Sequence, residues 1–381
     1  MTTMTLYYAT NRKHEGTDRW HPTGYGTKFS DDGMENLRFG RIDVQADAAR
    51  VEELLMKGGG AAGPGDGEAL ADYLGKRAKS GRIDAFEEKL DPKMSDRLQT
   101  DAKLGSKAMF ADLQGVMTNS TDVVVFVHGF NVSWADAVGS ALALQTMLDR
   151  SPVGDPAQHV AVVLFTWPSD GLALPFASYK SDRTEAAGSG NAFARGLLKV
   201  RDFLIALRRG ADSGGPPLCG QDIHLLCHSM GNYLLQNTLT RIDDYTPGSA
   251  MPRLFENIFL CAPDVDDAVL EPDQPLGRLH EIARSVTVYY NRGDKALVIS
   301  DYTKGNPERL GSNGAARPQQ LHIKFEQVDC SDIVEGGAEH SYYLSGHTNS
   351  DIRLSIDGQP PDGASRRRRP VGTTPRVWRL E

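Results

Sequence analysis

Residues 222–239 read DIHLLCHSMGNYLLQNTL, and this stretch decides which fold the sequence predicts. The apolar run at its start, residues 223–227, is typical of a short buried strand. After Gly231, leucines recur at helical spacing, at positions 234, 235 and 239. Ser229 lies between the two patterns. The stretch therefore predicts a strand, a tight turn that carries a serine, and a helix.

The serine in this turn has two interpretations. In a nucleophile elbow the turn is so tight that the serine is lifted above the sheet edge, and its close neighbours must be small. Cys227 and Gly231 occupy the neighbouring positions here, and cysteine is larger than the usual glycine but still compact. Alternatively, Ser229 only caps the helix, since serine is a favoured N-cap residue. Five residues do not separate the two interpretations, so the rest of the chain must decide.

The composition is that of an ordinary globular protein, long enough for one large domain or two. The chain has 381 residues, of which 40% are hydrophobic and 24% charged, and a formal net charge of −8. This acidic balance argues against nucleic acid as the main partner. Neither a zinc site nor a disulfide framework is expected, because no C-x-x-C pair occurs and the cysteines are widely spaced, at Cys219, Cys227, Cys261 and Cys330. We expect buried, reduced thiols and no metal or cofactor.

The chain shows no targeting or membrane signal. Its N-terminus lacks a charged region followed by an apolar one, so it does not resemble a secretion signal. No stretch approaches the roughly 20 apolar residues of a membrane span. We therefore expect a cytoplasmic protein without membrane contact.

The first 120 residues are expected to form strands and a helical extension packed on the core. Strands are predicted over Thr5–Ala9 and Asn36–Val44, with a polar, glycine-rich loop over 13–36 between them. Gly58–Gly67 has the composition of a flexible linker and lacks phosphate-loop spacing. The charged residues 68–116 predict surface helices.

Residues 121–358 predict an α/β core with a mostly parallel sheet covered by helices on both faces, because strand and helix patterns alternate. Polar motifs follow the predicted strands, where the active residues of such sheets gather. The predicted strands are Val123–Val127, Val160–Thr166, 223–227, Leu254–Leu260, Val286–Tyr290 and Leu321–Val328. The predicted helices are Trp134–Leu148, Ala192–Arg209, the one after Gly231, and Asn349–Ser355, with a loop through Tyr179 and Asp182.

The last residues, 359–381, are rich in proline and glycine and contain four consecutive arginines, Arg366–Arg369. Such a run is most often a solvated, flexible tail, with binding to an anionic partner as the less common alternative.

A serine becomes a nucleophile when a histidine removes its proton and a carboxylate orients that histidine. Where the serine lies on an elbow, the acid and then the histidine follow it along the chain. Asp294 is favoured as the acid because its turn is short and follows a strong strand pattern. A surface turn is the alternative for Asp294, and the other candidate acids are Asp264, Asp266 and Asp267.

Four histidines follow the serine. His340 is favoured as the base because it lies in a glycine-rich loop after the last predicted strand. His347 is the second candidate, although it is placed to cap the final helix. His280 lies in an amphipathic helical stretch and His322 opens a strand, so structural roles are expected for both.

A tetrahedral oxyanion needs two converging N–H donors. The N–H of Met230 is one candidate, and the N–H of Phe130, in the loop 128–131, is the other, with Gly129 allowing close approach. A structural role is the alternative for His128. Substrate contacts are expected from Phe130, Asn131, Trp134, Trp167, Phe176 and Tyr179, with plain packing as the alternative for the aromatic residues.

With these residues in place, the sequence resembles the α/β-hydrolases, and within them a bacterial family of uncharacterised esterase- and lipase-like proteins. The resemblance covers most of the chain and implies an α/β-hydrolase fold with Ser229, Asp294 and His340 as a catalytic triad, but little about substrate. The linker 58–67, the arginine tail and Cys227 depart from the family pattern. The motifs that carry the resemblance are Tyr8–Arg12, Leu37–Gly40, Val127–Asn131, Phe165–Ser169 with Tyr179 and Asp182, His228–Gly231, Ala262–Asp266, Tyr289–Leu297, and His340–Tyr343 ahead of Asp351.

The sequence therefore predicts a serine hydrolase of carboxylesterase type, acting on a small-molecule ester or thioester through an acyl-enzyme. An acyltransferase would use the same residues. A binding module without turnover is the alternative from another class, because a fold does not fix a function. A lipase whose arginine tail touches anionic headgroups is a third hypothesis.

Overall fold

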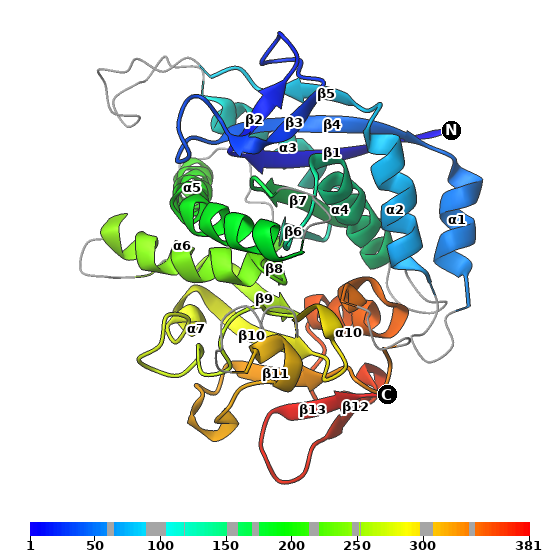
Figure 1. Ribbon diagram of the computed structural model, residues 1–381, viewed down its shortest axis with the longest axis vertical. Coiled ribbons are helices and arrows are strands. Elements are labelled where there is room, and N and C mark those ends of the chain that lie inside the picture. Colours follow the sequence, from blue (N-terminus) through cyan, green and yellow to red (C-terminus); the bar gives the residue numbers. More distant parts are fainter. Residues whose placement is uncertain are drawn as a thin grey trace.

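The structure is a computed structural model that describes residues 1–58, 65–88, 104–117, 119–150, 159–169, 175–212, 221–245, 251, 253–297, 308–334 and 340–381, without the side chains of 175–177, 206–212, 243 and 245. An 11-stranded sheet runs through the molecule in the order β12-β13-β11-β10-β9-β8-β6-β7-β1-β4-β5 (Figure 1). Neighbours are parallel from β13 to β1, and β12, β4 and β5 are antiparallel at the two ends. The strands are β1 Thr2–Thr10, β4 Arg38–Ala46, β5 Arg82–Ala85, β6 Asp122–Val127, β7 Val160–Thr166, β8 Asp222–His228, β9 Phe255–Cys261, β10 Ala283–Tyr290, β11 Phe325–Asp329, β12 Arg368–Pro370 and β13 Val377–Leu380.

Helices cover both faces of this sheet (Figure 1). One face packs against α3 Gly105–Met117, α5 Pro175–Asp212, α6 Gly231–Tyr245, α7 Leu279–Ile282 and the short α9 Leu310–Asn313. The other packs against α1 Ala48–Met56, α2 Gly67–Ala78, α4 Trp134–Asp149 and α10 Gly346–Ile356. Short 3₁₀ turns lie at Pro318–Gln320, Tyr342–Leu344 and Ala364–Arg366. The predicted α/β class, with a mostly parallel sheet between two helical layers, is confirmed.

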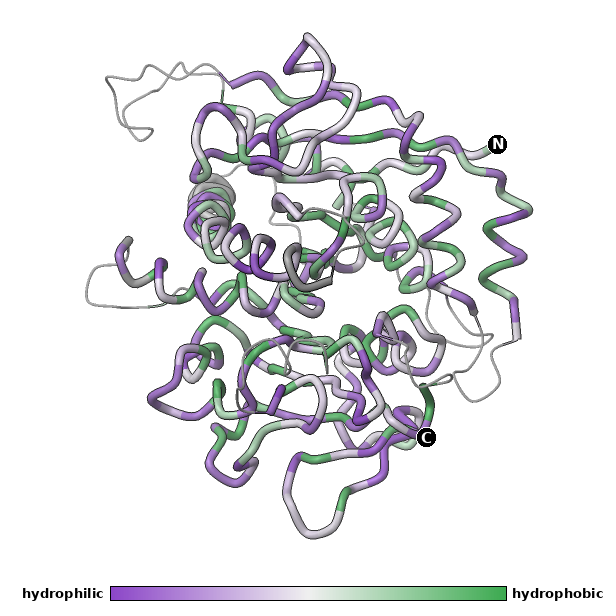
Figure 2. Tube along the Cα trace, in the orientation of Figure 1, coloured by the Kyte–Doolittle hydropathy of each residue, from purple (hydrophilic) through white to green (hydrophobic). Residues whose placement is uncertain are grey.

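The central strands form because they are apolar along their whole length. Every residue of β7 is buried, and β6 and β8 are buried nearly throughout. Strands covered on both faces need such continuous apolar runs rather than alternation. Figure 2 shows these hydrophobic stretches through the middle of the molecule.

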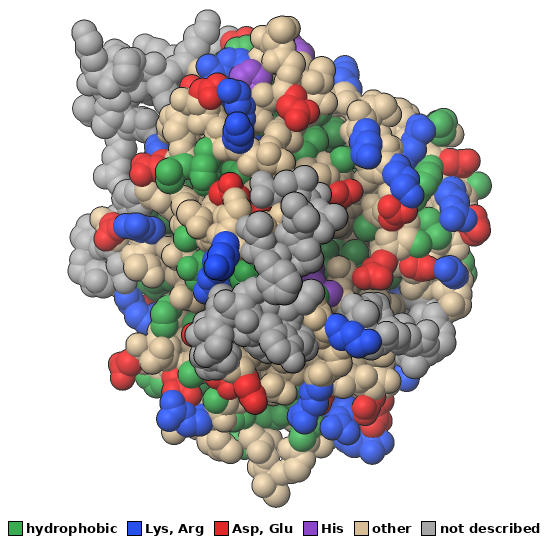
Figure 3. All heavy atoms as spheres, viewed as in Figure 1, with side chains coloured by type: hydrophobic (Ala, Val, Ile, Leu, Met, Phe, Trp, Pro, Cys, Tyr) green, Lys and Arg blue, Asp and Glu red, His purple; other side chains and the backbone are tan. Residues whose placement is uncertain are grey.

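Helix α4 is buried on nearly all sides because α2 lies against it. A Cβ on Gly139 would come within 2.4 Å of the carbonyl oxygen of Ala71, so only glycine allows the two helices to approach this closely. On the face in Figure 3, cationic and anionic side chains are interspersed, and pairs such as Lys76–Asp72 lie on the outer surface of α2. Among the described residues, no helix combines the length and apolarity that a membrane crossing requires.

The prediction of a loop over 13–36 is wrong in part. This region contains a hairpin of β2 Arg12–Glu15 and β3 Gly24–Phe29, which form a separate two-stranded sheet. Its strands are largely polar, so neither alternation nor a continuous apolar run marked them.

Other elements also differ from expectation. Helix α1 and strand β5 were not predicted, and the loop expected through Tyr179 and Asp182 is the first part of the long helix α5. Residues 59–64 of the expected linker lie outside the described residues. The end of that segment is ordered structure, because the Asp66 side chain caps α2 at Ala69 and Gly67 begins that helix.

The prediction of a flexible arginine tail is wrong. Strand β13 pairs with β11 and extends the sheet. Arg366 and Arg368 are buried and bind Asp351 of α10 at 2.7 and 2.8 Å, and Tyr289 donates its hydroxyl to the same carboxylate. Although burial raises the pKa of Asp351, the two guanidinium groups hold it below its usual value. Asp351, an acidic partner distant in sequence, thus holds two of the four arginines, Arg366 and Arg368, in the interior, whereas Arg367 and Arg369 are exposed.

We expect Asp351→Asn to lower the free energy of unfolding by about 3–5 kcal/mol, because it leaves two buried guanidinium groups without their shared anion. Urea denaturation of the full chain measures this change. Arg369→Gln is the matched control, since Arg369 is exposed and pairs with Glu381, and its effect should stay within about 0.5 kcal/mol. Equal losses in the two variants would contradict the proposed role of Asp351.

Candidate active site

Ser229 occupies a strained turn between β8 and α6. Its φ is 52°, in the left-handed region that residues other than glycine rarely adopt. The backbone is held from neighbouring strands: the Ser229 N–H donates to the Cys261 carbonyl oxygen at 2.9 Å, and Asn232 Nδ2 donates to the carbonyl oxygens of Cys227 and Ser229 at 3.0 Å. This is the strand–turn–helix geometry that an elbow requires.

The neighbours of the serine must be small, as expected. A Cβ on Gly129 would lie 2.7 Å from Ser229 Cβ, and one on Gly231 would lie 2.7 Å from the Val127 carbonyl oxygen. Cys227, which departs from the family pattern, is fully buried in the core on the face that α6 covers. Cys261 and Cys330 are also buried free thiols, and Cys219 lies outside the described residues.

The structure brings Asp294 and His340 together. His340 Nδ1 lies 2.6 Å from Asp294 Oδ2. Asp294 is buried after β10, where its Oδ1 also accepts the N–H groups of Ala296 and Leu297. A carboxylate oxygen accepts hydrogen bonds, so the Nδ1–H of His340 is the donor in this pair. The His340 ring lies 4.8 Å from the ring of His228, the residue that precedes Ser229.

None of the other candidate acids or bases forms the acid–histidine pair. Asp267 is half-buried, and burial, then the charges of Glu308 and Asp266, raise its pKa. Asp264 accepts the Tyr179 hydroxyl at 2.7 Å and pairs with Arg309, which also binds Asp266. The rings of His280 and His322 stack with their centroids 4.0 Å apart, just before β10 and β11 begin. They therefore lie at the opposite ends of the strands from Ser229. His347 contacts Arg367. Among the contacts of the described residues, His340 is the one of the four downstream histidines that pairs with a carboxylate at the elbow's end of the sheet.

The peptide unit that joins His340 to Ser341 is held on both sides. His228 Nε2 lies 3.2 Å from the His340 carbonyl oxygen, and burial lowers the pKa of His228 well below its ordinary value, so the ring is neutral and donates its Nε2–H. On the other side, the Glu68 carboxylate of α2 lies near the Ser341 N–H and close enough to His340 for its charge to be felt. Burial, and then the charge of Asp66, raise the pKa of Glu68.

Glu68 was missed by the sequence analysis. It lies in a charged, weakly helical region far from the motifs, and no local pattern distinguishes it. The contact depends on how α2 docks: Asp66 forms a β-bridge with Ser345, and a Cβ on Gly67 would lie 2.2 Å from the Leu344 carbonyl oxygen. The start of α2 is thus fixed against the segment that follows His340.

A buried arginine organises the loop after β6. Arg12 is 1% exposed, and its guanidinium reaches the segments after β1, β6 and β7. Its hydrogen bonds go to the Thr166 hydroxyl and to the carbonyl oxygens of Gly26, Ser169 and Val132. Asp182 holds the same loop from α5, since it accepts the Asn131 N–H and the Ser169 hydroxyl.

His128 is neutral in this environment. Burial, and then the nearby charge of Arg12, lower its pKa to about 3. Its Nε2 faces Arg12 at 3.4 Å and so accepts, which leaves Nδ1–H to donate to the Gly129 carbonyl oxygen at 2.9 Å. A structural role is the alternative expected for His128 from the sequence. This geometry fits that role, because the ring braces the loop.

The two predicted oxyanion donors are both close to Ser229 along the fold: Met230 directly follows it, and Phe130 directly follows Gly129, which packs against it. Among the described residues, neither the Met230 N–H nor the Phe130 N–H has a hydrogen-bond acceptor. The adjacent Asn131 has a φ of 59°, so the loop bends sharply just after Phe130. Within the same described part of the chain, no group of three histidine, cysteine, aspartate or glutamate side chains is arranged to hold a metal ion.

The expected substrate contacts separate into two sets. Trp134 and Trp167 are buried: Trp134 packs edge-on against Tyr8, and Trp167 stacks on His128. The prediction that these two tryptophans line a substrate surface is wrong, because core packing takes up both rings. The same holds for Tyr179, which is buried and donates its hydroxyl to Asp264. Phe130 is half-buried against Tyr179, Asn131 is exposed, and the Phe176 side chain lies outside the described residues.

We expect the free energy of unfolding to fall as the pH drops from about 6.5 towards 4, because the unfolded chain binds a proton at His128 that the folded chain excludes until about pH 3. In the His128→Asn variant, the slope of the free energy of unfolding against pH should be smaller by up to about 1.4 kcal/mol per pH unit. Urea denaturation at several pH values measures it. An unchanged slope in a folded variant would contradict a neutral, buried His128.

Comparisons with known proteins agree with this architecture. The family model described as "Alpha/beta hydrolase of unknown function (DUF900)" matches residues 107–352. The uncharacterised protein alr1448 from Nostoc sp. is 23% identical over 222 residues, covering 47% of this chain and 53% of that protein. The chain thus spans about half the length of this relative.

Solved structures of esterases are also similar, at low scores. Esterase B from Lactobacillus rhamnosis, in an inhibited form, is 12% identical with a TM-score of 0.32, covering 63% of this chain and 77% of that one. An arylesterase is 14% identical with a TM-score of 0.28, covering 62% and 74%. TM-scores this low carry no argument about activity. The family match spans more than half of the chain, so this protein belongs to the α/β-hydrolases of unknown function described as DUF900.

Proposed function

We propose that this protein is a serine hydrolase of carboxylesterase type, with Ser229 as nucleophile, His340 as base and Asp294 as the acid that orients His340. The 2.6 Å hydrogen bond between His340 and Asp294 carries the proposal. It lies at the end of the sheet where Ser229 adopts its strained, left-handed conformation. These residues come from three separate segments, and a structural role would not require their types to match those of a triad.

The proposed reaction has two steps. The Ser229 hydroxyl oxygen attacks the carbonyl carbon of an ester or thioester while its proton passes to His340 Nε2. The bond to the leaving oxygen or sulfur then breaks, and the alcohol or thiol departs with that proton. In the second step His340 takes a proton from water, whose oxygen attacks the acyl carbon; the carboxylic acid leaves and the proton returns to Ser229.

The oxyanion of both steps would be held by the N–H groups of Met230 and Phe130. Donors without a competing protein acceptor need no rearrangement as the charge develops. The nearby Arg12 adds a fixed positive charge behind the same loop, which favours negative charge at that position.

We expect Ser229→Ala to lower kcat for p-nitrophenyl butyrate about 10³-fold or more and to abolish fluorophosphonate labelling, without loss of fold. His340→Gln should behave similarly, whereas His347→Gln should stay near wild type because its ring contacts Arg367. Esterase assays with circular dichroism of each variant test this. Wild type that is folded but neither labelled nor active would favour a binding module. Faster product formation with added alcohol would indicate acyl transfer.

We expect Glu68 to act as a positioning residue. Glu68→Ala removes the carboxylate that lies near the Ser341 N–H and should lower kcat about tenfold with little change in KM. Glu68→Gln keeps an acceptor oxygen and should restore most of the rate. Asp72→Asn on the exposed side of the same helix is the matched control and should be neutral. Equal losses in the Ala and Gln variants would contradict positioning through a polar contact between residue 68 and the Ser341 N–H.

A further inference from the structure

Two peptide units beside Ser229 carry the proposed oxyanion donors. The Met230 N–H shares its peptide unit with the Ser229 carbonyl oxygen. The Phe130 N–H shares its unit with the Gly129 carbonyl oxygen. No peptide bond among the described residues is cis, and in a trans peptide the N–H and the carbonyl oxygen point in opposite directions. A hydrogen bond that fixes the carbonyl oxygen therefore also fixes the direction of the N–H.

The Ser229 carbonyl oxygen is held from the side of β9. It accepts the N–H of Asp264, which follows β9, at 3.2 Å, and it accepts Asn232 Nδ2, in the first turn of α6, at 3.0 Å. Asn232 Nδ2 lies within reach of three carbonyl oxygens, so the nitrogen of this amide, and not its oxygen, faces the turn. Because β8 lies between β9 and β6 (Figure 1), the Met230 N–H points away from β9 and towards β6.

The Gly129 carbonyl oxygen is held from the side of β7. It accepts His128 Nδ1–H at 2.9 Å. The His128 ring stacks on Trp167, which follows β7, and its Nε2 accepts the Trp167 N–H at 3.3 Å and faces Arg12 at 3.4 Å. These contacts keep the ring proton on Nδ1. Because β6 lies between β7 and β8, the Phe130 N–H points away from β7 and towards β8.

The two N–H directions converge beside Ser229. Each runs from an outer strand of the series β9-β8-β6-β7 towards its middle. A Cβ on Gly129 would lie 2.7 Å from Ser229 Cβ, so the two turns are in direct contact at this point. A carbonyl oxygen bound beside the serine hydroxyl would therefore face both donors.

We propose that His128 and Asn232 are positioning residues that aim the Phe130 and Met230 N–H groups at the oxyanion of the reaction. This inference rests on the proposed function. Hydrogen bonds weaken steeply once the angle at the hydrogen falls below about 120°. Loss of an anchor should therefore weaken binding of the transition state, where the oxygen is charged, more than binding of the neutral ester.

His128→Asn and His128→Gln are a matched pair of variants. The asparagine amide nitrogen takes the place of Nδ1 and keeps a donor for the Gly129 carbonyl oxygen, whereas the longer glutamine puts its amide near the place of Nε2. His128→Gln should lower kcat for p-nitrophenyl butyrate about 10²-fold, with KM within about twofold of wild type. His128→Asn should recover at least about tenfold of this loss.

Asn232→Leu keeps the shape of the side chain and removes its donor. It should lower kcat about tenfold, a smaller loss than that of His128→Gln, because the Asp264 N–H still holds the same carbonyl oxygen. Asn232→Ala takes its place if the first variant does not fold. Asn237→Ala is the matched control, since Asn237 Nδ2 donates to the Tyr233 carbonyl oxygen inside the same helix, and should keep kcat within about twofold of wild type.

A transition-state analogue separates positioning from a general loss of structure. The ketone 1,1,1-trifluorohexan-2-one forms a tetrahedral adduct with a serine, and its inhibition constant should rise in parallel with the fall in kcat/KM across the His128 and Asn232 variants. Variants that only destabilise the protein should not show this correlation.

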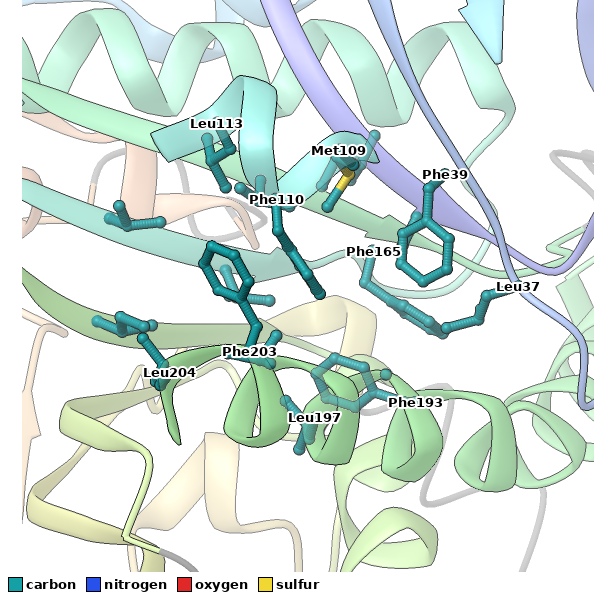
Figure 4. A pocket seen from close by; sticks show the side chains of 18 of the residues that line it. Leu37, Phe39, Met109, Phe110, Leu113, Phe165, Phe193, Leu197, Phe203 and Leu204 are labelled. Atoms are coloured by element: carbon teal, nitrogen blue, oxygen red, sulfur yellow. The ribbon is translucent and has the colours of Figure 1, made fainter. Parts of the chain in front are cut away.

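The control for destabilisation lies in the apolar cavity of Figure 4. This cavity, of about 80 Å³ between α3, α5 and the sheet, is lined by Phe203 and meets β8 at Ile223, whereas Ser229 follows the end of that strand. Six residues of extended chain correspond to about 20 Å. Phe203→Leu should lower the urea midpoint and leave kcat within about twofold of wild type.

One measurement does not depend on activity. In protein labelled with ¹⁵N-phenylalanine, the amide signal of Phe130 is assigned by its loss in Phe130→Leu. It should stay single in wild type and in His128→Asn, and become broadened or split in His128→Gln, where the carbonyl oxygen of the same peptide unit loses its donor.

Three results would overturn the proposal. They are equal kcat values in His128→Asn and His128→Gln, an unchanged inhibition constant in variants whose kcat falls, and a single, sharp Phe130 signal in His128→Gln. A folded wild type without esterase activity or fluorophosphonate labelling would contradict the proposed function instead. The amide signal would then still decide whether His128 orients this peptide unit.

Discussion

The left-handed backbone of Ser229 is the constraint on which the rest of the site depends. A residue with a side chain loses roughly 1–2 kcal/mol in that conformation. It persists because β9 accepts the Ser229 N–H, Asn232 bridges the two ends of the turn, and Gly129 and Gly231 leave room for it. All of these contacts come from buried central elements, so the rigidity of the sheet is what keeps the serine in place.

The segment that carries His340 is fixed from three directions. Asp294 binds the ring, His228 binds the carbonyl oxygen, and the Glu68 carboxylate lies near the following N–H. The third contact comes from α2, which lies outside the residues matched by the family model. The N-terminal region is therefore more than a covering layer, because one of its helices touches the segment on which the proposed chemistry depends.

The sequence predicted best what depends on local pattern. Continuous apolar runs identified the central strands, and residue order with turn chemistry selected Asp294 and His340, which the structure brings together. Their catalytic roles stay predictions. Features that depend on distant partners were missed. The arginines at 366 and 368 are buried because Asp351 neutralises them, and Trp134 and Trp167 are taken up by packing. The hairpin β2–β3 has no apolar pattern, and nothing local marks Glu68.

Arginine has a particular use at the candidate active site. One buried guanidinium, that of Arg12, donates to three carbonyl oxygens from separate segments, which a lysine ammonium would not span with the same fixed geometry. The cost is a positive charge in the interior, and His128 accommodates it by remaining neutral and accepting from Arg12. The loop that contains Phe130 is thus held by a cation, which donates to the Val132 carbonyl oxygen and faces His128. In the proposed mechanism, the group that shapes the loop would also favour the negative charge that forms there.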